Sequence, residues 1–301
     1  MSSTLVEFQY YLKIERSLSE NSIKSYVYDL QKLEDYLEKF EIKSPYTELD
    51  NAFLRHFIYD YAKVLSPRSL ARLISSLKTF YEYLLFNEDI EKNPMLNIDS
   101  PKFLKKIPFF LELNQIDDII DAVEHNDPHY FRNKAILETL YSCGLRVSEL
   151  CDLQLNRVYF DEGFIQILGK GNKERLVPLG DTLISYIKLY LENERSFLNA
   201  KKNCMSNLFL NNRGNRISRV MVFNVVKKHA KIAGLPEETS PHSFRHSFAS
   251  HMIENGADLR LVQDLLGHES ILTTEMYTHL SNSFIKNEIL SKHPRAKKNK
   301  S

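Results

Sequence analysis

Residues 66–86 read SPRSLARLISSLKTFYEYLLF, and this stretch decides the fold class of the first third of the chain. Ser66 suits a helix N-cap, because its hydroxyl can accept a hydrogen bond from a backbone N–H of the first turn. Pro67 suits the first helical position. Apolar residues then recur at intervals of three and four, which is the period of one helix face. The stretch therefore predicts an amphipathic helix that buries Leu70, Leu73, Ile74, Leu77, Phe80, Tyr81 and Leu84.

The opposite face of this predicted helix is polar and partly basic. Most solvent-exposed helix faces have such a composition, so these residues alone fit a solvated surface as well as a DNA-binding surface. The candidate DNA-binding residues are Arg68, Arg72, Ser75, Ser76, Lys78 and Thr79, with Lys78 near the border of the apolar face.

A second apolar stripe follows Ser19, which also suits an N-cap. The two stripes predict a compact helical domain of about four helices over residues 1–92. Residues 93–108, NPMLNIDSPKFLKKIP, contain three prolines and little periodicity, which is typical of an extended linker, and we place the boundary near residue 107. The residues of the second stripe are Ile23, Tyr26, Val27, Leu30, Leu33 and Leu37.

Residues 109–294 have a mixed pattern and predict a second domain. Helical periodicity recurs at roughly 114–124 and 127–143, and residues 157–178 are strand-like. There FIQILGKGNKERLVPL places β-forming residues on both sides of a Gly-Lys-Gly-Asn turn, as in a β-hairpin. Helical patterns then resume. The sequence thus predicts a mainly α protein with a small β-hairpin or sheet, in which an α+β domain follows a helical one.

Composition limits the class of protein only broadly. The chain has 301 residues, 43% of them hydrophobic, and its 40 Lys and Arg residues nearly balance 39 Asp and Glu residues. Three widely spaced cysteines do not form a disulfide framework, which fits a reducing cytoplasm. The first residues, MSSTLVEFQYYLKIERS, carry frequent charges, so we expect neither a signal peptide nor a membrane span. The basic residues 295–301 are expected to form a disordered tail.

The first candidate catalytic residue, Arg146, lies in the stretch YSCGLRVSEL, residues 141–150. Gly144 can end one helix, and Ser148 and Glu149 suit the start of the next. Arg146 is therefore expected at a helix junction. An arginine in such a place is often structural, so its role depends on which residues accompany it.

Three further candidates lie at predicted turns or helix ends. Lys170 lies at the hairpin tip between two glycines, and Lys173 follows the turn. His268 follows Gly267 in LLGHES, and Tyr277 lies nine residues later in TTEMYTHL. Each of these residues alone has an ordinary structural explanation.

Residues 240–252, SPHSFRHSFASHM, predict a helix that begins with cationic side chains. His242 and Arg245 are three residues apart and so project from the same side of the helix. A helix N-terminus offers free backbone N–H groups and a positive dipole end, which favour an anion. His246 could pair with His242 on a metal, but no carboxylate completes an H-E-x-x-H pattern, so no metal is expected here.

Two arginines, a lysine, two histidines and a tyrosine together suit attack on a phosphodiester. Arginine forks bind two phosphate oxygens with a geometry that lysine does not reproduce, and they stabilise the charge of the transition state. In their order and approximate spacing, these six positions resemble the tyrosine recombinases, and within them the Xer type. The motifs that carry the resemblance are GLRVSEL, GKGNKERLVPL, HSFRH, ENGADLRLVQDLLGHES, MYTH and HPRA.

The resemblance implies a two-domain clamp. A helical core-binding domain over residues 1–92 would be joined by the linker 93–108 to a catalytic domain over residues 109–294. It also implies that Arg146 and Arg245 hold the scissile phosphate, while His268 adds a hydrogen bond.

The remaining implied roles concern bond exchange. Tyr277 would attack to form a 3′-phosphotyrosyl link and free a 5′-hydroxyl. His242 would assist proton transfer, and Lys170 would protonate the leaving oxygen. Because one phosphoester replaces another, rejoining would need no ATP, metal or nucleotide cofactor.

The resemblance further implies double-stranded DNA as partner, with a dif-like recombination site. It implies a homo- or hetero-tetramer on two DNA sites, with a sister Xer recombinase and an FtsK-type DNA translocase as further partners. The biological role would be chromosome dimer resolution before cell division. The apolar residues Phe284, Ile285, Ile289 and Leu290 would dock either on their own domain or into a neighbouring protomer.

Three other functions remain open at this point. A type IB topoisomerase would use the same nucleophile and relax supercoils without exchanging partners. A helical DNA-binding regulator would bind DNA and leave it intact. A metal-dependent phosphohydrolase built on His242, His246 and His251 would lose activity in EDTA.

Overall fold

The computed structural model describes residues 3–101, 109–169, 173–267, 289–293 and 295. The chain forms two compact units, residues 1–106 and 107–301. Each unit has a hydrophobic core of its own. None of the described helices is both long enough and apolar enough to cross a membrane.

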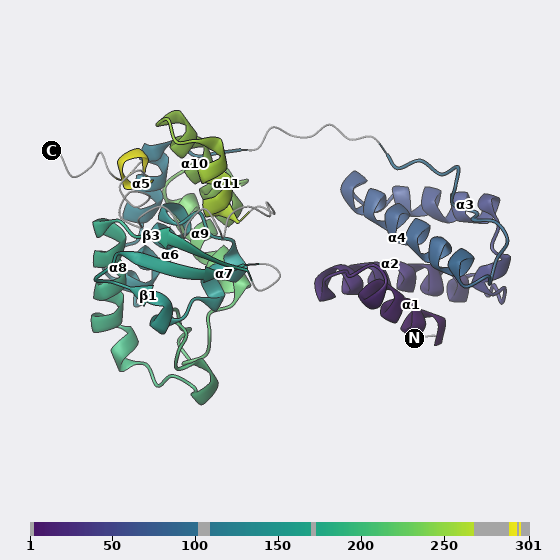
Figure 1. Cartoon of the computed structure of the whole chain (residues 1–301), viewed down its shortest axis with the longest axis horizontal. Helices are drawn as coiled ribbons and strands as arrows, with labels where there is room; N and C mark the ends of the chain where they lie inside the picture. The colour runs from purple at the N-terminus through teal and green to yellow at the C-terminus, as the bar shows by residue number, and fades with distance from the viewer. Residues whose placement is uncertain (1–2, 102–108, 170–172, 268–288, 294, 296–301) are drawn as a thin grey trace. The chain divides into compact units, whose positions relative to one another are not determined.

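The first unit contains four α-helices among the residues described. They are α1 (Ser3–Ile14), α2 (Glu20–Lys39), α3 (Asn51–Ala62) and α4 (Pro67–Phe86). α4 packs against the other three, so its apolar face lies in the core (Figure 1). The number of helices agrees with the sequence analysis.

The predicted helix starts are confirmed at both long helices of this unit. The Ser19 hydroxyl accepts a hydrogen bond from the Ser22 backbone N–H, and the Ser66 hydroxyl accepts one from that of Ser69, each at 3.3 Å. Pro67 occupies the first turn of α4. All seven apolar residues predicted to face inward on α4 are buried.

The polar face of α4 is narrower than predicted, because Ser76 and Thr79 are buried. For Ser76 the reason is Asp29 on α2, whose fully buried carboxylate requires hydrogen-bond donors. The Ser76 hydroxyl donates to it over 3.1 Å. The Thr79 hydroxyl donates to the carbonyl of Ser75 one turn earlier. The expectation that both side chains are exposed was wrong, and their contact with DNA stays a prediction.

The first part of the predicted linker belongs to the first unit. Met95 and Ile98 are buried in its core, and the Asn51 side chain donates a hydrogen bond to the Pro94 carbonyl at 2.7 Å. Apolar side chains between the prolines thus attach this stretch to α3 and its neighbours. Residues 102–108 lie outside the described part of the chain.

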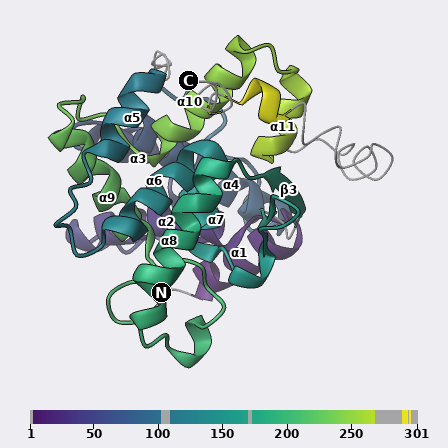
Figure 2. The same ribbon diagram turned by 90° about the vertical axis from the view of Figure 1, so that its left-hand side faces the viewer.

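The second unit combines helices with one three-stranded antiparallel sheet. α6 runs through its core and packs against α8 and α10; Figure 2 shows α6 beside α8. The elements are α5 (Leu113–Asp121), α6 (Tyr130–Ser142), α7 (Val147–Asp152), β1 (Val158–Tyr159), β2 (Phe164–Leu168), β3 (Glu174–Pro178), α8 (Asp181–Asn193), α9 (Arg219–Ile232), α10 (Pro241–Glu254) and α11 (Leu259–Leu266).

The predicted hairpin is confirmed in the pairing of β2 with β3. Leu168 lies opposite Glu174, and the Gly169 N–H donates to the Lys173 carbonyl at 2.7 Å, which closes the base of the turn. Lys170, at the predicted tip, lies outside the described residues. The three cysteines are free, as expected, and all three are buried.

The described C-terminal residues pack on their own unit. Ile289 lies in the core, and the predicted start of the tail, Arg295, is buried. The Arg295 guanidinium binds both oxygens of Glu138 on α6, at 2.9 and 2.7 Å, and also Asp117. A buried carboxylate requires a cation, which explains why this arginine leaves the solvent. Phe284 and Ile285 lie outside the described residues.

Candidate catalytic site

Arg146 lies at a helix junction, as predicted. α6 ends at Ser142, and Gly144 adopts φ +55°, where a Cβ atom would come within 2.5 Å of the Phe248 ring. This left-handed turn is therefore suited to glycine. Arg146 then serves as the N-cap of α7, and its backbone N–H donates to the Glu149 carboxylate at 2.9 Å. The local sequence thus fixes the backbone position from which the Arg146 side chain extends.

Arg245 reaches the same turn from α10. That helix begins at Pro241 after a capping box formed by Ser240 and Ser243. The Arg245 Nη1 donates to the Gly144 carbonyl at 2.7 Å, and Nη2 donates to the Leu266 carbonyl at 2.5 Å. The fold therefore brings together two arginines that are about 100 residues apart in sequence, because α10 packs on α6.

Glu149 holds the cluster together. Its carboxylate accepts hydrogen bonds from Arg146 Nη1 at 2.7 Å and from Arg175 Nη1 and Nη2 at 3.0 and 2.8 Å. Burial raises the pKa of this carboxyl, but the hydrogen bonds and charge of Arg175, with those of Arg146, outweigh burial and lower it overall. Glu149 is therefore ionised and neutralises part of the arginine charge.

The cluster retains an excess of positive charge, because three guanidinium groups surround one carboxylate. Arg245 Nη1 lies 3.9 Å from the Glu149 carboxylate. Burial, then the charge of Arg146, lower the pKa of Arg245 to about 10, so it remains protonated at neutral pH. The Arg146 side chain is 34% exposed, whereas that of Arg245 is 11% exposed. Such a partly open, cationic cluster is suited to binding a phosphate.

Two glycines at this cluster directly precede catalytic candidates. Gly267 caps α11 with φ +66°, and a Cβ there would lie 3.1 Å from Arg175 Nη1. A Cβ on Gly169 would lie 3.5 Å from the same atom. The residues immediately before Lys170 and His268 thus converge on the arginines. Lys170, His268 and Tyr277 themselves lie outside the described residues.

The three histidines of α10 do not share one site. His242 and His246 are exposed, and burial, then the charges of His242 and Arg245, lower the pKa of His246. His251 is buried, and its Nδ1 lies 2.8 Å from the Tyr141 hydroxyl. Over the described ranges, no group of three or more His, Cys, Asp or Glu side chains is placed to hold a metal ion. The metal-dependent alternative therefore has no geometric support.

Arg175 and Glu149 were not among the residues predicted to form the site. Glu149 had one sequence signal, because it lies three residues after Arg146 at the position of a capping box. Arg175 had no such sequence signal, because a basic residue in a strand of alternating polarity usually points to solvent. Its burial depends on distant segments, because Arg175 bonds to Glu149 of α7 and to the Leu265 carbonyl of α11.

The candidate DNA-binding residues of α4 differ in their surroundings. Arg68 and Ser75 are exposed and Lys78 is half-buried. Arg72 binds Asp29 through Nε and Nη2 at 2.8 and 2.9 Å, although 44% of its side chain remains exposed. Arg72 therefore has a structural role in addition to any contact with DNA.

We expect Arg72→Ala to lower the free energy of unfolding by roughly 1–3 kcal/mol, because the buried Asp29 loses two donors. The effect should lie toward the low end, since Lys32 still pairs with Asp29 at 2.7 Å. If Arg72 also contacts phosphate, the salt dependence of duplex binding should weaken by about one unit of log–log slope.

Arg68→Ala is the matched control for this prediction. Arg68 lies one turn earlier on the same helix and is exposed. Its loss should weaken DNA binding with no change in melting temperature. If both variants kept the same DNA affinity and salt slope, the polar face of α4 would be a solvated surface that does not contact DNA.

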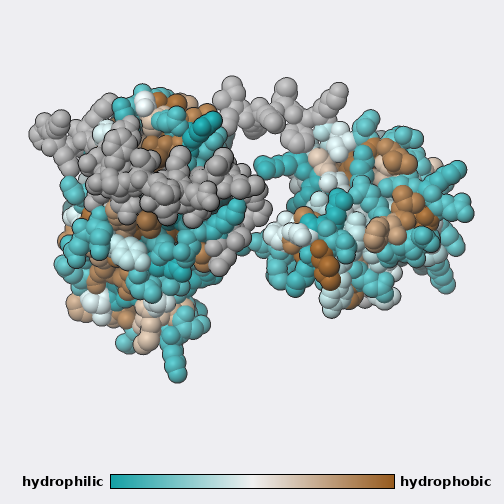
Figure 3. All heavy atoms as spheres, viewed as in Figure 1, coloured by the Kyte–Doolittle hydropathy of each residue, from teal (hydrophilic) through white to brown (hydrophobic). Residues whose placement is uncertain are grey.

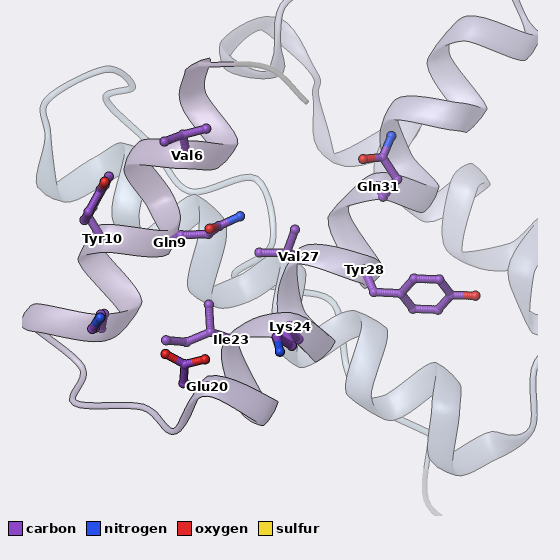
Figure 4. A pocket seen from close by; sticks show the side chains of 10 residues that line it. Val6, Gln9, Tyr10, Glu20, Ile23, Lys24, Val27, Tyr28 and Gln31 are labelled. Carbon is purple, nitrogen blue, oxygen red and sulfur yellow. The ribbon is translucent and has the colours of Figure 1, made fainter. Parts of the chain in front are cut away.

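A groove of about 510 Å³ lies between α1 and α2 of the first unit. Figure 4 shows Gln9 of α1 extending toward Val27 of α2, and Val6 and Ile23 also line the groove. On the visible face of this unit, apolar side chains form separate patches among hydrophilic ones (Figure 3). The groove contains no residue of the arginine cluster, which belongs to the second unit.

Comparison with known proteins agrees with this geometry. Residues 110–283 match the model of the phage integrase family, and residues 5–87 match that of the phage integrase N-terminal SAM-like domain. The tyrosine recombinase XerD of Staphylococcus saprophyticus is 39% identical over 98% of this chain and 100% of its own length. That of Chlorobaculum tepidum is 41% identical over 97% of this chain and 96% of its own length.

Solved structures show the same fold. XerH site-specific recombinase bound to difH substrate aligns with a TM-score of 0.69 at 24% identity, over 95% of this chain and 84% of that one. A lambda integrase dimer on a COC′ core site aligns with a TM-score of 0.70 at 17% identity, over 89% of this chain and 94% of that one.

The chain belongs to the phage integrase family of tyrosine recombinases. Within that family it is an Xer-type site-specific recombinase, with a SAM-like helical unit followed by the catalytic unit.

Proposed function

We propose that this recombinase cleaves and rejoins double-stranded DNA through a 3′-phosphotyrosyl intermediate on Tyr277. The observation that carries the proposal is the convergence of Arg146 and Arg245 around the buried Glu149. Their guanidinium groups would bind the non-bridging oxygens of the scissile phosphate and stabilise its transition-state charge. Gly169 and Gly267 support the proposal, since the chain enters the Lys170 and His268 positions from beside the cluster.

The other residues take roles in proton transfer and orientation. A tyrosine hydroxyl has a pKa of about 10, so nearby cations would favour the phenolate of Tyr277. His242 would accept or relay its proton, and His268 would donate a hydrogen bond to the phosphate. Lys170 would protonate the 5′-oxygen as it leaves. The phosphoester is conserved, so a partner 5′-hydroxyl can attack the phosphotyrosine without ATP or a metal ion.

The proposed biological role is chromosome dimer resolution at a dif-like site in the cytoplasm. Family membership supports DNA as the partner, and proteins of this fold have been solved on DNA, including a lambda integrase tetramer on a Holliday junction. We propose a tetramer on two DNA sites, formed by this chain alone or with a sister Xer recombinase and activated by an FtsK-type translocase. Both units would contact the same duplex.

A suicide DNA substrate tests the reaction directly. A nick placed just beyond the cleavage position lets the short product diffuse away, so that the covalent intermediate accumulates. We expect protein to become attached to the 3′ end of one strand at a single position. Attachment at a 5′ end, or cleavage with no attached protein, would contradict the proposal.

The role of Lys170 can be separated from that of the other cations by changing the leaving atom. A thiol has a pKa of about 8.5, whereas water has one near 15.7, so a thiolate can leave without a general acid. Lys170→Ala should cleave normal DNA about 100-fold or more slowly. It should cleave a strand with a 5′-bridging sulfur at close to the unsubstituted protein's rate.

Lys173 is the rival candidate and supplies the control. It lies exposed at the base of the same hairpin. Sulfur rescue of Lys173→Ala in place of Lys170→Ala would reassign the acid. Rescue of neither variant would show that the hairpin lysines only bind phosphate.

A further inference from the structure

Arg175 joins three segments of the catalytic unit. It lies on β3, directly after the lysine-bearing turn, and only 11% of its side chain is exposed. Two of its hydrogen bonds form a fork with the Glu149 carboxylate of α7, and its Nε donates to the Leu265 carbonyl of α11 at 2.7 Å. A charged fork of this kind restricts distance and angle more than a single hydrogen bond does.

These bonds orient Arg175 away from a ligand. Nε and both terminal nitrogens donate to protein oxygens, and the side chain is far less exposed than that of Arg146. The same contacts place it against the start of the turn, since a Cβ on Gly169 would lie 3.5 Å from its Nη1. Arg175 therefore fastens the hairpin to the cluster rather than extending into the open side of it.

We propose that Arg175 is a positioning residue, which holds the base of the β2–β3 hairpin against Glu149 and α11 so that Lys170 is presented to the scissile phosphate. The inference rests on the proposed role of Lys170 as general acid. Glu149 has other partners on its own helix, because the Arg146 backbone and side chain both bind it. Loss of Arg175 should therefore disturb the hairpin more than the position of Arg146.

The test is a double-mutant cycle with the two leaving atoms. We expect Arg175→Ala to slow single-turnover cleavage of normal DNA by about 10- to 100-fold, as a displacement of catalytic groups by about 1 Å can do. The loss should largely disappear with the 5′-bridging sulfur strand. Lys170→Ala/Arg175→Ala should be no slower on normal DNA than Lys170→Ala, because the second change removes nothing further.

Equal slowing on oxygen and sulfur strands, or multiplied losses in the double variant, would overturn the proposal and indicate a direct or general structural role. Lys170→Ala alone tests whether Lys170 is the general acid. If the sulfur strand does not restore cleavage by this variant, Lys170 is not the acid. The double-mutant cycle on normal DNA still decides whether Arg175 acts through Lys170. Arg157→Ala is the matched control, since Arg157 binds Glu174 of the same strand at 2.9 Å. It should cleave both strands normally.

A second variant guards against loss of the fold. Arg175→Lys keeps a positive charge beside Glu149 and lacks the fork to both carboxylate oxygens. If Arg175→Ala fails to bind duplex or melts early, Arg175→Lys should show the same oxygen-specific defect with normal binding. An Arg175→Lys protein with unchanged cleavage of normal DNA would contradict the positioning role.

Discussion

Tyr277→Phe is expected to abolish covalent attachment to a suicide DNA substrate. The phenyl ring has no oxygen to form the phosphoester, so no slower route through the same residue remains. Duplex affinity should change by less than about tenfold, because one hydrogen bond contributes about 1 kcal/mol. The measurement pairs a gel assay for the protein–DNA adduct with a duplex-binding titration.

A second tyrosine serves as the control for this result. Tyr159 lies on β1, and its hydroxyl donates to the Gln166 side chain at 3.4 Å. Tyr159→Phe should form the adduct at the normal rate. Adduct formation by Tyr277→Phe would show that another residue is the nucleophile.

Arg245→Ala is expected to slow single-turnover cleavage by about 100-fold or more, as does the loss of a preorganised donor at a developing charge. Arg146→Ala should have a loss of similar size. Unlike Lys170→Ala, both variants should stay slow on the 5′-bridging sulfur strand, because charge on the non-bridging oxygens still requires stabilisation. Normal cleavage by either variant would contradict its assigned role.

The Arg245 result needs a control for structural damage, because this side chain also binds the Gly144 and Leu266 carbonyls. Arg195 offers one. Its guanidinium likewise donates to backbone carbonyls, those of Met205 and Asn207 among them, but it lies outside the cluster. Arg195→Ala should lower thermal stability with cleavage per folded molecule unchanged. A cleavage defect that followed thermal stability in both variants would assign Arg245 a structural role only.

Much of the fold could be predicted from sequence because the relevant interactions are local. A cap such as Ser66 acts within one turn, and a three-and-four apolar repeat determines which face of α4 is buried. The Gly-Lys-Gly-Asn turn likewise specifies the β2–β3 hairpin through its own backbone preferences. These features require no knowledge of distant segments.

The errors arose where a polar side chain is buried by a distant partner. Ser76 has the sequence context of a surface residue, yet it faces Asp29 on α2. Arg295 has that of a tail residue, yet it neutralises Glu138 on α6. The burial of these residues depends on a partner dozens to more than a hundred positions away, so helical periodicity carries no record of it.

The sequence by itself determined the class of this protein. The order and spacing of Arg146, Lys170, His242, Arg245, His268 and Tyr277 pointed to a tyrosine recombinase, and the comparisons confirm that family. Local backbone signals also placed Arg146 at its junction and Arg245 near the start of a helix.

Only the tertiary structure decided how the arginines are held. Glu149 and Arg175 became part of the site because Arg175 on β3 lies against α7 and α11, which leaves a buried carboxylate and a largely buried guanidinium that must pair with each other. A charge removed from water is stable only beside a suitable partner, and that requirement arises when the chain folds.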